Sequence, residues 1–194
     1  MTLFRLAQKA GLLSLATVGF TSCLSEPSYP NTPEISFERI DRTRYSTPTT
    51  GIVDSIFITV NFQDGDGDLG LSNTEATSAP FGSASAPYRN HIVTPFILNT
   101  ATGRYDSARL VYPYLPKNSY YSTFDHISTT TDNRASPLRG TLTRRYGFSL
   151  GSPFLNPQYT PNATSQQVKF TISILDRAKH QSNEVETTPI TISR

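Results

Sequence analysis

Alternation of apolar and polar residues is the main pattern along this chain. Residues 56–62 place apolar side chains at every second position, namely Ile56, Ile58, Val60 and Phe62. Residues 168–174 repeat the alternation, with apolar side chains at Val168, Phe170, Ile172 and Ile174. A period of two residues is typical of a β-strand with one buried face. The sequence therefore predicts a strong strand in each half of the chain.

Shorter segments of similar character lie around these two strands. They are rich in Thr, Tyr, Phe, Ile or Val and are bounded by residues that favour turns. These candidate strands are 35–40, 91–98, 104–112, 120–127, 138–148 and 185–193. Fourteen prolines disfavour long helices, and no helical apolar period is sustained over ten residues after residue 22. About seven or eight short strands predict an all-β fold, an antiparallel β-sandwich.

The N-terminal residues follow a different pattern. Arg5 and Lys9 precede an apolar run at 11–20, which is far shorter than the roughly 20 residues that span a bilayer. A basic start followed by a short apolar run predicts a secretory signal peptide over 1–22. Cys23 comes next and is the only cysteine. Its position resembles the lipobox of bacterial lipoproteins, which implies that Cys23 carries a diacylglycerol. An ordinary signal peptide with a nearby cysteine is the alternative.

Removal of a signal peptide would change both length and charge. Taking 22 residues from 194 leaves 172, a length that suits one domain. Two cations and no acid are lost, so the formal net charge falls from +2 to 0 and no basic excess remains to attract nucleic acid. Residues 23–48 are rich in Pro, Ser and Thr and predict a tether, and 49–194 the β-sandwich domain. We expect a cell-envelope protein held in the lipid bilayer through acylated Cys23.

An acidic turn follows directly after the strand at 56–62. Three carboxylates, Asp64, Asp66 and Asp68, alternate with glycines that permit a tight turn. Carboxylate oxygens are the ligands that calcium prefers. Two like charges at 4 Å repel by about 4 kcal/mol at an effective dielectric of 20, so converging carboxylates favour a cation. The sequence predicts a calcium site at these three aspartates, and a solvated turn without metal is the alternative.

Two further acids are candidate ligands for the same ion, Glu75 and Asp176. Glu75 would be the twelfth residue of an EF-hand loop that starts at Asp64. The sixth position of that loop requires glycine, and this chain has Leu69 there. We therefore expect a calcium-binding β-turn. Asp176 is a candidate because it closely follows the strand at 168–174.

Two segments carry a resemblance to known proteins. Residues 58–70, which include the acidic turn, resemble a turn found in many uncharacterised lipoproteins of the Bacteroidota. Residues 170–178, together with Ser182 and Asn183, resemble the last strands of their immunoglobulin-like domains. The resemblance implies an immunoglobulin-like β-sandwich and an outer-membrane lipoprotein, on the periplasmic or the surface side. It implies no enzymatic activity.

A serine hydrolase is an alternative function. Residues 147–151 spell G-x-S-x-G, with Ser149 in the place of the nucleophile. That motif requires a helix directly after the serine, and the prolines that follow disfavour one. The histidine available in the required chain order is His180, with Asp176 or an earlier acid. We therefore predict a non-enzymatic binding or structural module.

A glycan or another envelope protein is a candidate partner. The densest aromatic cluster consists of Tyr112, Tyr114, Tyr120, Tyr121 and Phe124. Aromatic rings on an exposed sheet can stack on sugar rings, but they also fill the cores of β-sandwiches. The cluster therefore leaves both a glycan-binding lipoprotein and ordinary core packing open.

Overall fold

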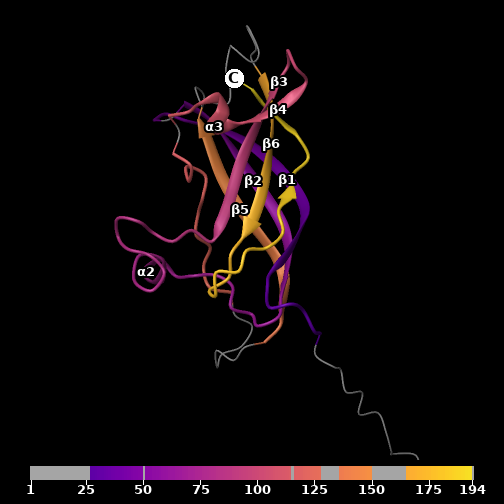
Figure 1. Cartoon of the computed structure of the whole chain (residues 1–194). Helices are drawn as coiled ribbons and strands as arrows, with labels where there is room; N and C mark the ends of the chain where they lie inside the picture. The colour runs from indigo at the N-terminus through magenta and orange to yellow at the C-terminus, as the bar shows by residue number, and fades with distance from the viewer. Residues whose placement is uncertain (1–26, 50, 115, 128–135, 150–164, 194) are drawn as a thin grey trace, which may run out of the picture.

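The computed structural model describes residues 27–49, 51–114, 116–127, 136–149 and 165–193 (Figure 1). The predicted signal peptide and Cys23 lie outside these residues. Within them, the strands form two antiparallel sheets. No helix of the described residues is long and apolar enough to cross a membrane. The predicted all-β, antiparallel character is confirmed.

The first sheet has three strands and the second has five. The first has the order β1-β2-β5, with β1 at Glu34–Thr47, β2 at Gly51–Asp64 and β5 at Leu138–Ser149. The second has the order β4-β3-β6-β7, and β8 also pairs with β6. Its strands are β3 at His91–Asn99, β4 at Arg104–Ser107, β6 at Ser165–Ile174, β7 at Val185–Glu186 and β8 at Ile190–Ser193.

One hydrophobic core lies between the sheets. The alternating apolar residues of β2 and β6 are all buried in it, as the sequence predicts. Ile35 of β1, Val93 of β3 and Ile192 of β8 belong to the same cluster. Burying each large apolar side chain contributes roughly 1.5–3 kcal/mol, so this shared cluster is the main force that joins the two sheets.

Strand β1 is the largest departure from the sequence prediction. The predicted tether over 23–48 is wrong for residues 34–47, which pair with β2 along their whole length. The candidate strand at 35–40 is part of β1, but its extension to residue 47 was not predicted, because the side chains at 41–46 are exposed and Ile35 is the only apolar residue of β1 in the core cluster. Main-chain pairing with β2 holds it in place. The β domain therefore begins before the predicted boundary at residue 49.

Two other predicted strands are strands only in part. In 104–112, β4 ends at Ser107, whose hydroxyl accepts a hydrogen bond from the Leu110 N–H (3.3 Å) and caps the short helix α3, Ala108–Val111. In 120–127, the pairing with β3 is a single bridge between Ser122 and His91. Further pairing is replaced by the buried Asn90 side chain, which bonds both the N–H and the C=O of Phe124.

The predicted last strand, 185–193, is interrupted between β7 and β8. The N–H of Thr187 donates to the carbonyl of Phe170, and the Thr187 hydroxyl accepts from the Phe170 N–H (3.1 Å). A side-chain oxygen therefore stands where a main-chain carbonyl would continue the ladder. Pro189, which has no N–H, follows in the gap.

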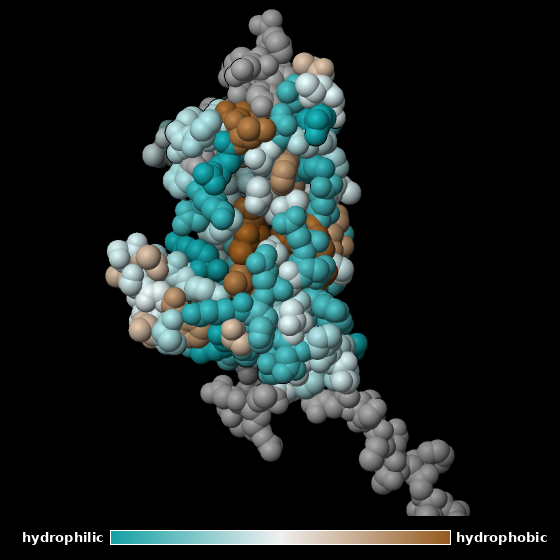
Figure 2. Space-filling model, viewed as in Figure 1, coloured by the Kyte–Doolittle hydropathy of each residue, from teal (hydrophilic) through white to brown (hydrophobic). Residues whose placement is uncertain are grey.

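The two short helices lie in loops near different ends of the sheets (Figure 1). Helix α2, Asn73–Ala76, forms part of a lobe at the lower left of Figure 2, in the long loop after β2. Ser72 and Glu75 form a capping box at its start, which satisfies free N–H groups of the first turn. Helix α3 lies at the top of the same view, where hydrophobic residues gather on the surface.

Candidate metal centre

The acidic turn lies where one strand of each sheet ends. β2 ends at Asp64, and Asp176 lies two residues beyond the end of β6. The turn pairs with the segment after β6: Leu69 forms a bridge with Asp176, and the Arg177 N–H donates to the carbonyl of Asp68 (3.2 Å). One oxygen each from Asp64, Asp68 and Asp176 therefore lies within 4.8 Å of the other two. The name acid cluster is used below for these three residues.

Two glycines allow the turn to pack this closely. Gly67 has φ +67°, and a Cβ atom there would lie 2.1 Å from the carbonyl oxygen of Ser136. Gly65 donates its N–H to the carbonyl of Pro30 (2.7 Å), and a Cβ atom there would meet the carbonyl of Tyr29 at 2.2 Å. Any side chain at these positions would push the turn away from its neighbours. The chain before β1 thus packs against the acidic turn at Gly65.

Asp64 and Asp176 are buried, Asp66 and Asp68 are half-buried, and three oxygens of the turn lack a hydrogen-bond partner among the described residues. Asp64 is 0% exposed; its Oδ2 accepts from the Asp68 N–H (3.1 Å). Asp68 Oδ2 accepts from the Ala178 N–H (3.2 Å). The Oδ1 atoms of Asp64, Asp66 and Asp68 are buried without any partner in the described part of the chain. A buried acceptor left unsatisfied costs about 1–3 kcal/mol, and more when it is charged.

Burial and the repulsion of neighbouring carboxylates make Asp64 and Asp68 hard to ionise without a cation. Burial raises the pKa of Asp64 to about 7, and the charges of Asp66, Asp68 and Asp176 add to the rise. Burial also raises the pKa of Asp68, followed by the charges of Asp176 and Asp66. A cation among the carboxylates would reverse both causes, because it favours the charged form.

Asp176 is held in place by the residue four positions later. Its Oδ1 accepts the main-chain N–H of His180 (2.7 Å), and its Oδ2 lies 2.8 Å from the Nδ1 atom of the same histidine. Outer partners of this kind orient a ligating carboxylate. His180 therefore belongs to the surroundings of the acid cluster. Sequence reasoning considered it only as a partner of a nucleophilic serine.

Glu75 and Asp66 are placed differently from the other predicted ligands. Glu75 accepts from Arg177 (2.6 Å) through Oε1 and from the Ser72 N–H and hydroxyl through Oε2, so both oxygens are engaged. The hydrogen bond from Arg177, followed by those from Ser72, lowers the pKa of Glu75 to about 2. Asp66 is not one of the three acids whose oxygens converge, although its charge acts on two of them.

Ser149 and His180 lie at different ends of the sheets. Leu138 pairs with Asp64 at one end of β5, and Ser149 pairs with Val53 at the other. Eleven residues separate these two ends, and a strand rises about 3.3 Å per residue, so the separation is roughly 36 Å. His180 bonds Asp176 at the Asp64 end. A triad of Ser149, His180 and Asp176 is therefore not assembled in this fold.

The aromatic cluster is divided by the fold. Phe124 is buried in the core, and Tyr112 and Tyr120 pack against it from outside. Tyr114 is 74% exposed and meets the Tyr112 ring edge-on at 5.7 Å. Tyr120 and Tyr121 line a cavity beside β3. Part of this aromatic cluster therefore packs in or against the core, and part of it lies at the surface.

No family model matches this chain, and no curated protein does. Among solved structures, it is similar to the crystal structure of a protein assigned as ApaA of Bordetella pertussis, with 9% sequence identity. That match covers 86% of this chain and 97% of that chain at a TM-score of 0.25, which carries no conclusion about function.

Proposed function

We propose that this chain is a non-enzymatic, lipid-anchored protein of the cell envelope whose β domain is stabilised by a calcium ion at the acid cluster, with Asp66 beside it. The observation that carries the calcium proposal is the set of three buried carboxylate oxygens without a hydrogen-bond partner in the described residues. Such oxygens are costly in an apo protein and become ligands when an ion is bound.

The donor set favours calcium over other common metals. The three converging residues offer oxygen atoms and neither nitrogen nor sulfur, which disfavours zinc. Calcium accepts six to eight oxygens in flexible geometry, so water and neighbouring groups can complete the shell. Magnesium requires near-ideal octahedral geometry and gives up its waters reluctantly. Three aspartates also supply more negative charge than a monovalent ion would balance.

The ion would act as a link between the two sheets. Asp64 ends a strand of the first sheet, and Asp176 follows a strand of the second. A cation that contacts both would oppose separation of the sheets at this end. It would also stabilise the turn that contacts Pro30, and therefore the start of the domain.

The anchor would bring this end of the domain close to a bilayer. The seven residues from Cys23 to Pro30 span roughly 25 Å at most when fully extended. Because Pro30 contacts Gly65 of the acidic turn, the acid cluster would lie at the end nearest the lipid. Outer-membrane placement rests on the resemblance of the sequence to Bacteroidota lipoproteins. The side of the membrane is left open.

We also infer an immunoglobulin-like arrangement of the strands. The first, second and fifth strands share one sheet, while the third, sixth and last strands share the other. This supports an immunoglobulin-like order in which β4, paired with β3, takes the place of strand C′. The loops after β2 and β6, which hold the acid cluster, then belong to the same end of the domain.

A thermal melt of the purified protein tests the calcium proposal. With calcium at a hundredfold excess over its dissociation constant, we expect a stabilisation of about 2.7 kcal/mol relative to chelator, or roughly 5–10 °C in Tm. Magnesium should give a much smaller shift. An unchanged Tm in chelator would show that the acidic turn is only a turn.

A Cys23→Ser variant tests the anchor independently of calcium. We expect the variant to be released from membranes or to remain an unprocessed precursor, as seen by fractionation and mass spectrometry. Unchanged membrane partition and processing would refute lipidation at Cys23.

A further inference from the structure

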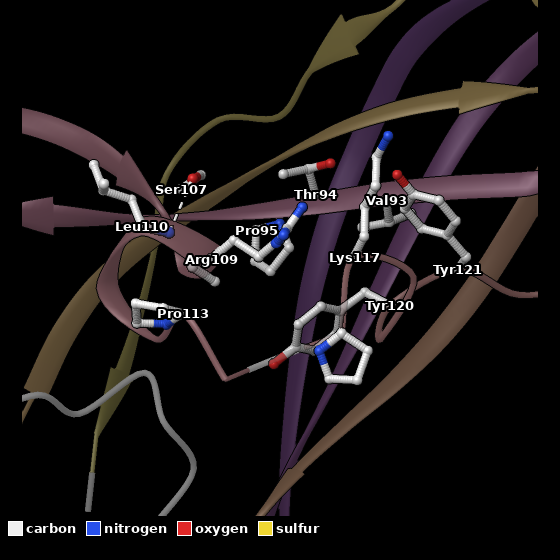
Figure 3. Close-up of a pocket in the computed structure, with 12 residues that line it drawn as sticks. Val93, Thr94, Pro95, Ser107, Arg109, Leu110, Pro113, Lys117, Tyr120 and Tyr121 are labelled. Carbon is white, nitrogen blue, oxygen red and sulfur yellow. Dashed lines mark hydrogen bonds between the residues drawn. The ribbon is translucent and has the colours of Figure 1, made fainter.

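Two adjoining cavities lie where the segment after α3 passes beside β3. The first has a volume of about 450 Å³ and is bordered by α3 and residues 113–121 (Figure 3). The second has a volume of about 700 Å³ and is bordered by β3, the end of β6 and the segment that follows it. Thr94, Lys117 and Tyr121 line both, so the two cavities meet at these residues. Each volume lies within the roughly 300–1,000 Å³ of small-molecule sites, and together they suit an elongated ligand.

Side chains on the outer face of the second sheet form the floor of the second cavity. Successive residues of a strand point to opposite faces, and Val93 belongs to the core. Ile92 and Thr94 are therefore directed away from the core, and both are half-buried. Ser173 lies opposite Ile92 on β6 and lines the same cavity. A ligand would contact these side chains and would need no access to the main chain of β3.

The first cavity combines apolar walls with two cations. Figure 3 shows the rings of Pro113 and Tyr120 on one side, with the charged ends of Arg109 and Lys117 directed away from them. Leu110, which is 66% exposed, adds to the apolar wall. Neither cation makes a hydrogen bond or an ion pair with any residue that the structure describes, and no acid is among the described lining residues. This cavity therefore offers charge-assisted donors for an anion beside a flat apolar surface.

The second cavity is polar and offers both donors and acceptors. The side chains of Asn118 and Glu184 make no hydrogen bond to the described part of the chain. Gln181 donates from Nε2 to the hydroxyl of Ser173 (3.0 Å), which leaves its Oε1 atom as an acceptor. Amide side chains can donate and accept, as hydroxyl groups do, so they match a ligand that carries several hydroxyls. The half-buried ring of Tyr121 supplies an apolar face at the junction of the cavities.

We propose that the two cavities together bind an acidic oligosaccharide, whose smallest unit is a uronic acid joined to a neutral sugar. The carboxylate of the uronic acid binds Arg109 and Lys117, and its ring packs against Tyr120. The neutral sugar lies in the second cavity, where its hydroxyls bond the side chains of Asn118 and Glu184.

The distribution of charge excludes other ligands and sets the direction of this one. A fatty acid fits the first cavity but leaves the polar groups of the second without partners. A neutral sugar leaves Arg109 and Lys117 without a counter-charge. Glu184 would repel a second carboxylate, so the acidic ring belongs in the first cavity and the neutral ring in the second.

Titration calorimetry with the full-length protein tests the role of the carboxylate. The probes are a disaccharide of glucuronic acid and a neutral hexose, and the same disaccharide with its carboxyl group reduced to an alcohol. We expect the reduced form to bind at least about tenfold more weakly, because it loses a charge-assisted interaction. Arg109→Ala and Lys117→Ala should each weaken the acidic form by a similar factor and leave the reduced form unchanged. Arg104→Ala, an exposed arginine of β4 outside both cavities, is the matched control and should bind normally.

Two further substitutions test the second cavity. Tyr121→Ala should weaken the acidic and the reduced disaccharide alike, because the ring contacts no charge. A disaccharide of two uronic acids should bind the native protein more weakly than the mixed one, and Glu184→Gln should remove this difference. Circular dichroism of each variant checks that the fold is kept.

Three outcomes would overturn the proposal. The first is equal binding of the acidic and reduced disaccharides, and the second is no binding at millimolar sugar. The third is binding of octanoate as tightly as the acidic disaccharide, which would assign the first cavity to apolar acids.

Discussion

Strand β2 carries a buried aspartate near each of its ends, and the two differ in what balances their charge. Asp54 is 3% exposed and accepts two hydrogen bonds from Arg44, at 2.8 and 2.9 Å. Asp64 is fully buried but has a main-chain N–H and neighbouring carboxylates in place of a cation. The first charge is neutralised within the chain. The second needs a proton or an external ion.

The register of the first sheet explains the difference. Arg44 lies directly opposite Asp54 on β1, so the pair forms whenever the two strands align. Arg44 also bonds the carbonyl of Ser193, and Arg42 bonds that of Thr191, so the same cations connect β1 to β8. At the other end, the residue of β5 opposite Asp64 is Leu138. The same residue type on one strand is therefore structural in one place and a candidate ligand in the other.

The largest expected effect comes from Asp64→Asn. Without this charge, we expect the calcium-dependent rise in Tm of roughly 5–10 °C to disappear. In chelator, the variant should melt above the native protein, because a buried, repelled carboxylate has been removed. Calorimetry with and without calcium measures both. A variant that kept the full calcium shift would place the ion elsewhere.

The pH dependence of the chelated protein gives the next largest effect. Asp64 has a pKa of about 7 in the folded protein, above its ordinary value of 3.8. The folded state therefore binds more protons between these values, and stability is lost as the pH rises through about 7. In chelator, Tm should be several degrees higher at pH 5 than at pH 8. In calcium the difference should shrink or reverse, because protons compete with the ion.

A smaller effect is expected from Asp54→Asn. Asparagine keeps the size of the side chain but loses the charge that balances Arg44, which is itself one third exposed. We expect a loss of about 1–2 kcal/mol, or roughly 2–8 °C. The loss should be equal in calcium and in chelator. A loss that appeared only in chelator would mean that the two ends of β2 are energetically coupled, contrary to the comparison above.

The sequence predicts the strands that bury one face in the core. It predicts less well the strands that are held mainly by main-chain pairing and ion pairs with a neighbouring strand. β2 and β6 were found because every second residue enters the core. β1 was predicted only over 35–40, because the rest of it is held by its register with β2 and by ion pairs such as that of Arg44, which no local pattern shows. The burial of His91 and its contact with Tyr146 were not predicted for a similar reason. His91 is buried and lies 2.7 Å from the hydroxyl of Tyr146, on a strand of the other sheet.

The candidate site could be predicted in part. Asp64 and Asp68 were found because their spacing with glycine is local, and Asp176 because it closely follows a strongly patterned strand. Their convergence depends on how the two sheets pack, which no local pattern encodes. Asp66 was predicted as a ligand only because it alternates with glycine between Asp64 and Asp68. In the structure the turn has a left-handed residue at Gly67, and Asp66 is not among the three acids whose oxygens converge.

The smallest expected effect concerns Glu75, whose charge, like that of Asp54, is balanced by an arginine. Glu75→Gln keeps a side chain that can complete the capping box of α2 but loses the ion pair with Arg177. Because both groups are about one third exposed, we expect a loss of at most about 1 kcal/mol, or at most roughly 2–4 °C. Calcium affinity, measured by titration calorimetry, should be unchanged, since the oxygens of Glu75 are engaged by Ser72 and Arg177 and lie outside the acid cluster. If Glu75 were a ligand, as the EF-hand spacing would have it, affinity would fall by tenfold or more. Such a fall would require the loop after β2 to rearrange around the ion.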